Sequence, residues 1–221
     1  MNLHKMMEEL SGINDIAWGR YAFSRDFLRD KIDNQTKEAM IRKAILCGYE
    51  KADEVIKTCG TADPGQIAEK LHLKVQETDS GQMADRILFA LFTPPNLIQI
   101  MEEPIKKAAA CPEITDFFSE DMIKSLILGH EIFHYLEEND ETIYTRTEKI
   151  TLWKFLGYAN KSTVRALSEI AGIYFTKKLN SFTYSPFALD IILYYNYDSE
   201  QSERIYKDIM RFGQEVFEQY G

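Results

Sequence analysis

Cysteine is scarce in this sequence and follows no recognisable pattern. The three cysteines, Cys47, Cys59 and Cys111, are odd in number, widely spaced and outside any C-x-x-C arrangement. Disulfide frameworks and cysteine zinc sites both need paired or closely spaced cysteines. The sequence therefore indicates neither of them, and it favours a reducing compartment.

Long apolar runs are also missing. The N-terminus lacks the apolar core of a secretory signal, and no run approaches the length that spans a bilayer. We therefore expect a cytoplasmic protein without a membrane partner.

Positive charge is not concentrated anywhere in the chain. The formal net charge is −9 at pH 7, and acidic and basic residues are mixed over what look like solvated helix faces. A nucleic-acid-binding surface normally shows a stripe of Lys and Arg on a basic domain, so direct nucleic-acid binding is not expected. With 221 residues, the chain suits one domain, or one domain with a helical extension.

One short segment carries recognisable chemistry. His130, Glu131 and His134 form an H-E-x-x-H pattern. On an α-helix, residues i and i+4 project from the same face, so both imidazoles can bind one metal ion while Glu131 lies beside it. Zn²⁺ accepts neutral imidazole nitrogen and lowers the pKa of a bound water to ~7. The pattern predicts a zinc site at which Glu131 takes the proton of that water.

The residues upstream of this pattern favour a helix. Ser119 is a typical N-cap, and two acidic residues follow it in the first turn, so we expect a helix over residues 119–138. Its apolar residues fall on the same face as the two histidines, which therefore point inward. A single inward histidine is more often structural, but here two of the four histidines share one stripe with an acid between them.

A catalytic zinc site needs a third protein ligand, and two residues compete for that role. In the metzincin pattern the third ligand follows a glycine turn, and the corresponding positions here hold Glu137 and Asp140. Glu137 would have to make that turn against its steric preference. In the gluzincin arrangement a second helix supplies a carboxylate, here Glu169, and Gly172 on the same face lets the two helices approach closely. We favour Glu169.

The rest of the chain is expected to be mainly helical with one small sheet. Three strands are predicted over residues 73–78, 86–93 and 97–101, the last two joined at Pro94-Pro95-Asn96 as a hairpin. No element is assigned to residues 139–161. Helices are expected over residues 13–59 in two pieces divided at Asp33-Asn34, then over 63–71, 104–110, 162–179 starting at a Ser162 cap, 185–194 and 199–220.

Together these segments resemble the ImmA/IrrE family of metallopeptidases, intracellular zinc proteins associated with mobile elements and stress responses. Three stretches carry the resemblance: residues 62–75 with the strands that follow, Gly129-His130-Glu131-Ile132-Phe133-His134, and residues 169–179, which read EIAGIYFTKKL. The chain departs from the family at Gly172-Ile173, where members usually have Ala-Asn after the glutamate, and in a longer linker between the two motifs.

The resemblance implies a fold, a division of the chain and an activity. The implied fold is α+β, a mainly helical zincin-like metallopeptidase with a small three-stranded sheet. Residues 1–60 would form an N-terminal helical extension packed on the core, and residues 61–221 the metallopeptidase domain with C-terminal helices. The implied activity is Zn²⁺-dependent peptide hydrolysis with His130, His134 and Glu169 as ligands and Glu131 as general base. The implied substrate or partner is a helix-turn-helix transcriptional repressor.

Two other functions remain open at this stage. A non-catalytic zinc-binding regulator would act by binding a repressor, and a zinc hydrolase would act on a small molecule. A structural zinc site has no need of a general base, so Glu131 favours catalysis. The sequence does not rank the possible donors to a tetrahedral oxyanion, which are Tyr135, Tyr144, Tyr158, Tyr174, Tyr184 and Arg165.

Overall fold

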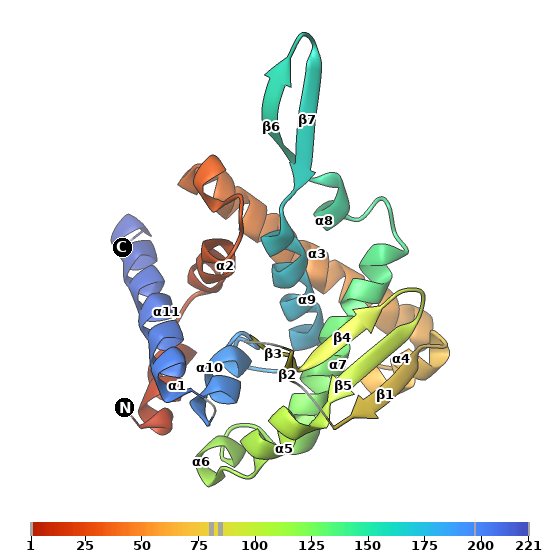
Figure 1. Ribbon diagram of the computed structural model, residues 1–221, viewed down its shortest axis with the longest axis vertical. Coiled ribbons are helices and arrows are strands. Elements are labelled where there is room, and N and C mark those ends of the chain that lie inside the picture. The colour runs from red at the N-terminus through yellow and green to blue at the C-terminus, as the bar shows by residue number, and fades with distance from the viewer. Residues whose placement is uncertain (1, 80–81, 84–85, 197, 221) are drawn as a thin grey trace.

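The computed structural model of the chain describes residues 2–79, 82–83, 86–196 and 198–220 and is mostly helical (Figure 1). The strands are β1 (Lys74–Thr78), β2 (Gln82–Met83), β3 (Arg86–Ile87), β4 (Ala90–Thr93), β5 (Leu97–Met101), β6 (Lys149–Phe155) and β7 (Tyr158–Thr163). The helices are α1 (Leu3–Ser11), α2 (Asp15–Ser24), the 3-10 turn η1 (Arg29–Lys31), α3 (Asn34–Cys59), α4 (Pro64–Lys70), α5 (Glu102–Ala109), α6 (Pro112–Thr115), α7 (Glu120–Glu138), α8 (Tyr144–Thr147), α9 (Arg165–Leu179), α10 (Ala188–Tyr195) and α11 (Ser199–Tyr220). These elements confirm a mainly helical α+β fold.

Local sequence signals set several helix ends. The Asp33 side chain accepts a hydrogen bond from Thr36 N and starts α3, and Gly60 ends that helix in the left-handed region at φ 67°. Asp63 caps α4, and Pro64 takes its first position. The helix boundaries predicted at residues 33–34, 59 and 63 agree with these ends, because capping depends on neighbouring residues alone.

The N-terminal region contains more breaks than expected. The first predicted piece of the 13–59 region is the short helix α2, and residues 25–33 form a connection that includes η1. Helix α1 was not predicted. It buries Leu3, Met6, Met7 and Leu10 along one side and contacts α11, which is distant in sequence. A nine-residue helix is marginal by itself, so this tertiary contact accounts for its stability.

The sheet has the strand order β1-β5-β4. β4 and β5 form the predicted hairpin, and β1 runs parallel to β5 on the other side, so β4 is an edge strand. The prediction of one strand over residues 86–93 is wrong. The structure divides this stretch into β3, which pairs with β2, and β4, which pairs with β5. The two parts of this stretch pair with different strands. The strand propensity of individual residues does not specify which strand each part pairs with.

Another hairpin, formed by β6 and β7, begins within the unassigned region, after α8, and projects from the rest of the molecule in Figure 1. The prediction that Ser162 caps a helix is wrong, since Ser162 pairs with Ile150 within this hairpin and α9 begins only at Arg165. A serine before an apolar stretch fits a cap, but cross-strand pairing satisfies this backbone instead.

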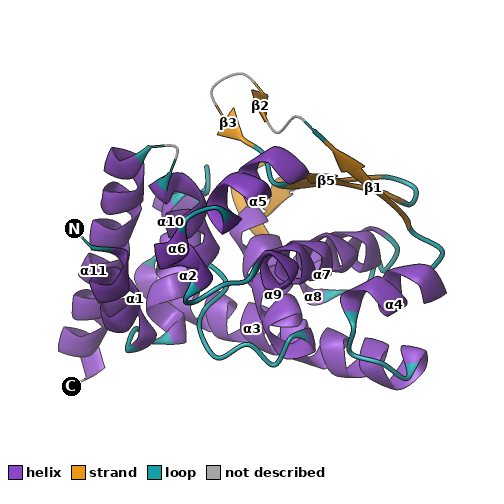
Figure 2. Cartoon of the chain, turned by 90° about the horizontal axis from the view of Figure 1, so that it is seen from below, coloured by secondary structure: helices purple, strands orange, loops and turns teal. Residues whose placement is uncertain are grey.

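Helix α9 lies between α3 and α7 and contacts both along its length. Figure 2 shows the sheet of β1 and β5 covering α7. The buried core contains side chains from both sides of residue 60, and the division of the chain at that residue stays a prediction. Within the described ranges, none of the helices combines the length and apolar character needed to cross a membrane.

Candidate metal centre

The two histidines of the H-E-x-x-H pattern lie on one face of α7, as predicted. The Ser119 hydroxyl caps the helix by accepting from Met122 N, and Ile123, Leu126 and Ile127 bury the face that leads to the histidines. The Nε2 atoms of His130 and His134 are 2.9 Å apart, and their ring centroids are 4.6 Å apart. The helical spacing alone therefore brings two metal-ligating nitrogens together.

Glu169 reaches the same point from α9. Its Oε2 lies 3.4 Å from His130 Nε2, and one ligand atom from each of His130, His134 and Glu169 lies within 4.8 Å of the others. Ligands at ~2.0–2.1 Å from one tetrahedral ion are about 3.3–3.4 Å apart. These three residues can hold a metal ion. Two imidazoles and one carboxylate would fill three of the four positions of a tetrahedral ion and leave the fourth open.

Small residues allow α9 to come this close to α7. A Cβ atom added to Gly172 would lie 2.9 Å from His130 Nδ1, and one added to Gly129 would lie 2.3 Å from Thr176 Oγ1. Thr176 Oγ1 also donates to the Leu126 carbonyl oxygen at 2.7 Å, which ties the two helices together. The prediction that Gly172 faces the first helix is confirmed, and Gly129 provides a second close contact.

The alternative ligand Asp140 is not part of this group. Its carboxylate pairs with Lys51 at 3.0 Å and accepts from the backbone N and hydroxyl of Thr142 at 2.9 and 2.6 Å. The Thr142 and Lys51 hydrogen bonds lower the pKa of Asp140 to about 2. Asp140 therefore stabilises the turn after α7 and links it to α3.

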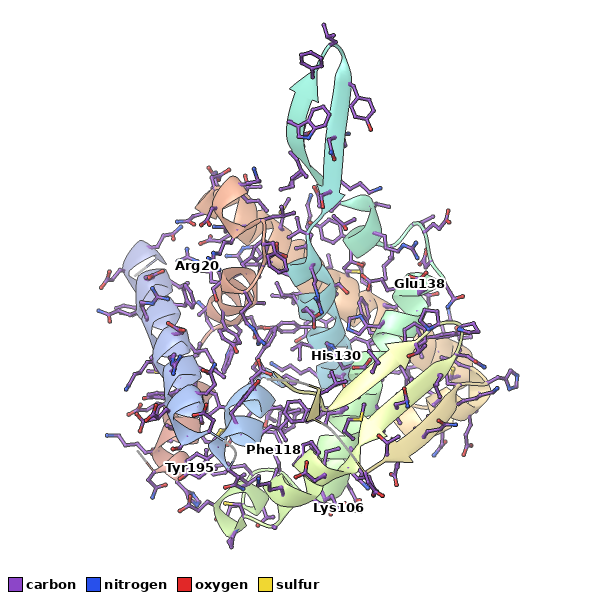
Figure 3. The ribbon with its side chains drawn as sticks, viewed as in Figure 1. Arg20, Lys106, Phe118, His130, Glu138 and Tyr195 are labelled. Atoms are coloured by element: carbon purple, nitrogen blue, oxygen red, sulfur yellow. The ribbon has the colours of Figure 1, made fainter. Side chains whose placement is uncertain are left out.

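Glu131 is buried with 9% of its surface exposed, and its partner comes from the sheet. Its Oε2 accepts a hydrogen bond from the backbone N of Phe92 in β4 at 2.8 Å. Figure 3 labels His130 where α7 passes beside α9 and near β4. The carboxylate next to the ligand group is thus fixed by the edge strand of the sheet.

Two residues outside the predicted ligand set, Glu137 and Ser168, support His134. Glu137 Oε2 lies 3.4 Å from His134 Nδ1 and accepts a hydrogen bond from the Ser168 hydroxyl at 2.6 Å. A ligating histidine is usually oriented through its other ring nitrogen by such a carboxylate. The i, i+3 spacing of Glu137 from His134 is visible in the sequence, but the contribution of Ser168 depends on how α9 packs.

His130 is positioned by packing instead. Its Nδ1 is buried and has no hydrogen-bond partner among the described residues, while its ring lies against the Cα of Gly172. The Nε2 atom is the one that faces His134 and Glu169. The two imidazoles are therefore held in place by different means.

The electrostatics of the group favour a cation. Burial raises the pKa of Glu169, but the hydrogen bond to His130 and the charges of the histidines outweigh it and lower the pKa to about 2. Burial lowers the pKa of His134, whereas the Glu137 hydrogen bond and the charges of Glu169 and Glu131 raise it overall. Carboxylates on several sides of the two imidazoles fit a site for a divalent cation.

The possible oxyanion donors are dispersed. Arg165 contacts one of the proposed ligands, with its Nε 3.5 Å from Glu169 Oε1 and its side chain largely exposed. The Tyr135 ring packs edge-on against Phe92, and Tyr184 packs against Phe117 and Phe182. Tyr174 is fully buried against Tyr49, and Tyr158 lies on the projecting hairpin.

Comparisons of the chain with protein-family models, with curated proteins and with solved structures found no match. The geometry therefore shows that His130, His134 and Glu169, on the packed helices α7 and α9, can hold a metal ion.

Proposed function

We propose that this chain is a zinc-dependent metallopeptidase of the ImmA/IrrE type, cytoplasmic, acting on a regulatory protein such as a helix-turn-helix repressor. The observation that carries the proposal is the placement of Glu131 beside the His130, His134 and Glu169 group, fixed by Phe92 N. A site that only stabilises a fold has no use for a carboxylate that stands beside the metal without ligating it.

Zinc is the metal that this donor set fits best. Two neutral imidazoles and one carboxylate match catalytic zinc sites, whereas Mg²⁺ and Ca²⁺ prefer all-oxygen ligands. When bound, Zn²⁺ supplies polarisation of a carbonyl and lowers the pKa of a water molecule to ~7.

The residues of the chain would then divide the work. His130, His134 and Glu169 hold the ion, and Glu137 with Ser168 keeps the His134 ring in place. Glu131 accepts the proton of the attacking water and returns it to the leaving amine. Among the described residues, Phe92 N is the hydrogen-bond partner of this carboxylate, which leaves its other oxygen available for the proton transfer.

An extended peptide suits the surroundings of the site. β4 is an edge strand that contacts α7, so a substrate segment can lie along a strand beside the metal group. Edge strands bind peptides through main-chain hydrogen bonds, which suits a protein substrate better than a small molecule.

The test uses protein loaded with zinc and a library of quenched fluorogenic peptides. We expect cleavage by the wild type and a loss of at least a hundredfold in Glu131→Gln, with zinc content unchanged, because Glu131 transfers a proton and is not a ligand. Loss of zinc in that variant contradicts the assignment. If zinc-loaded wild type cleaves nothing, while both proteins relieve repression equally in cells, the chain is the non-catalytic regulator.

A further inference from the structure

The β6–β7 hairpin exposes several large apolar side chains away from the metal centre. The exposed fractions are 50% for Trp153, 67% for Phe155, 91% for Leu156 and 66% for Tyr158. The hairpin projects from the molecule in Figure 1, and its main contact with the rest of the chain is between β7 and α8. A two-stranded hairpin is marginally stable alone in water, so this one is suited to act against another surface.

The two faces of this hairpin carry different chemistry. The register pairs Phe155 with Tyr158 and Trp153 with Asn160, and the rings of Trp153 and Tyr158 are 5.6 Å apart. Because residues i and i+2 share a face, the three aromatic rings lie on one side. A register shift between Thr151 and Trp153 interrupts the alternation along β6, so the pairs Lys154–Ala159, Thr151–Lys161 and Lys149–Thr163 put three lysines on the other side.

The turn places an apolar residue where local preference opposes it. Leu156 and Gly157 have φ of 45° and 83°, as in a two-residue turn that favours Asn, Asp or Gly at both positions. Leucine in the left-handed region is strained and, at this tip, almost fully exposed to water. The backbone strain and the exposed apolar surface are both unfavourable for the isolated molecule. A contact between the leucine side chain and another surface would account for both.

The charge of the hairpin is opposite to that of the rest of the chain. Residues 149–163 contain Lys149, Lys154 and Lys161 and no acidic residue, in a chain with a net charge of −9. The seven residues of β6 make the hairpin about 23 Å long, more than two Debye lengths at physiological salt. The acidic body is therefore largely screened from whatever meets the tip.

We propose that the β6–β7 hairpin docks the protein on an anionic lipid bilayer, with Leu156 and the aromatic rings entering the interface and Lys154 and Lys161, the two lysines nearer the tip, meeting lipid phosphates. Trp and Tyr rings concentrate at such interfaces, and lysine stems extend to the headgroups. A protein partner is disfavoured because protein interfaces are depleted in lysine. Single-stranded nucleic acid is disfavoured because its binding sites place stacking rings and positive charges along the same groove, whereas here they lie on opposite sides of the hairpin. The expectation of no membrane partner rested on the lack of a spanning run, which a peripheral contact does not need.

The experiment is co-sedimentation of the full chain with vesicles of phosphatidylcholine alone or of equal parts phosphatidylcholine and phosphatidylglycerol. We expect binding to the mixed vesicles that weakens with salt, together with a blue shift of Trp153 emission, since Trp18 is buried in either state. Leu156→Asn should weaken binding at least tenfold. Asparagine suits the left-handed turn, so this variant removes the apolar tip and preserves the hairpin.

Two further variants separate the contributions. Replacement of Lys154 and Lys161 by Gln should remove the salt-dependent part of binding. Phe27→Asn, at an apolar side chain that is 92% exposed on the connection after α2, is the matched control and should bind as the wild type does. Absence of binding at low salt, or binding that Leu156→Asn leaves intact, overturns the proposal. So does a dimer, detected by light scattering, that needs Leu156 and forms without vesicle binding, since the hairpin would then dock on a second copy.

Discussion

The backbone N–H of Phe92 donates a hydrogen bond to Glu131 Oε2 over 2.8 Å, joining the edge strand β4 to the proposed general base on α7. The two residues are 39 positions apart in sequence. The donor is main chain, so the position of the carboxylate does not depend on which side chain residue 92 carries.

Substitutions at Phe92 should therefore separate the donor from the ring. Phe92→Ala keeps the N–H and should change peptide hydrolysis by no more than about threefold, whereas Phe92→Pro removes the donor and should reduce it on the order of tenfold or more. Steady-state kinetics on the peptide identified in the library screen provide the measurement, with circular dichroism to check folding. Equal effects of the two substitutions would assign the role to the ring, which packs against Tyr135.

Glu137 should determine metal affinity without being a ligand. Glu137→Gln weakens the partner of His134 Nδ1, and second-sphere changes of this kind typically cost about 10–100-fold in affinity. Ser168→Ala should have a smaller effect in the same direction. Competition with a zinc chelator measures both. Glu138→Gln, at an exposed neighbour that pairs with Arg146, is the control and should leave affinity unchanged.

Gly172→Ala should damage the site more than the fold. The new Cβ would lie 2.9 Å from His130 Nδ1, which is too close without a shift of the ring. Overpacking costs about 1–3 kcal/mol, and replacing glycine by alanine in a helix returns about 1 kcal/mol, so stability without metal should fall by no more than about 2 kcal/mol. Metal affinity should fall at least tenfold because His130 is displaced.

The matched control for that substitution is Gly12→Ala. Its Cβ would meet the Glu9 carbonyl oxygen at 3.8 Å, an ordinary contact, so neither stability nor metal affinity should fall. Chelator competition and urea denaturation measure the two quantities. A Gly172→Ala protein that binds zinc as tightly as the wild type would show that the close approach of α9 is not needed for the site.

Asp140 should contribute to stability and not to metal binding. Its folded pKa of about 2 lies below the ordinary value of about 3.9, so its stabilisation is present above pH 4 and is lost as the pH falls towards 2. Because solvent screens the pair with Lys51, Asp140→Asn should cost about 1 kcal/mol at pH 7. The difference from the wild type should shrink as urea denaturation is repeated from pH 5 downward.

Metal content tests the prediction that Asp140 does not bind the metal. Mass spectrometry of protein purified without chelator or nickel should find zinc in Asp140→Asn and no zinc in Glu169→Ala. Glu141→Gln, at an exposed acid beside Asp140, is the control for the stability measurement. Zinc lost with Asp140 alone would point to a metzincin-like turn after α7.

The sequence by itself determined the parts of this protein that depend on near neighbours. The i, i+4 spacing of His130 and His134, the caps at Ser119, Asp33 and Asp63, and the stop at Gly60 are consequences of helix geometry within a few residues. The sequence also favoured Glu169 over Asp140, through the small residue at Gly172.

Tertiary structure alone decided the rest, because the remaining partners are brought together by packing across long stretches of chain. The hydrogen bond from Phe92 to Glu131, the contact of Ser168 with Glu137 and the stabilisation of α1 by α11 all join distant segments. The same holds for the β6–β7 pairing, in which cross-strand hydrogen bonds satisfy the backbone around Ser162 and override a local helix-capping signal.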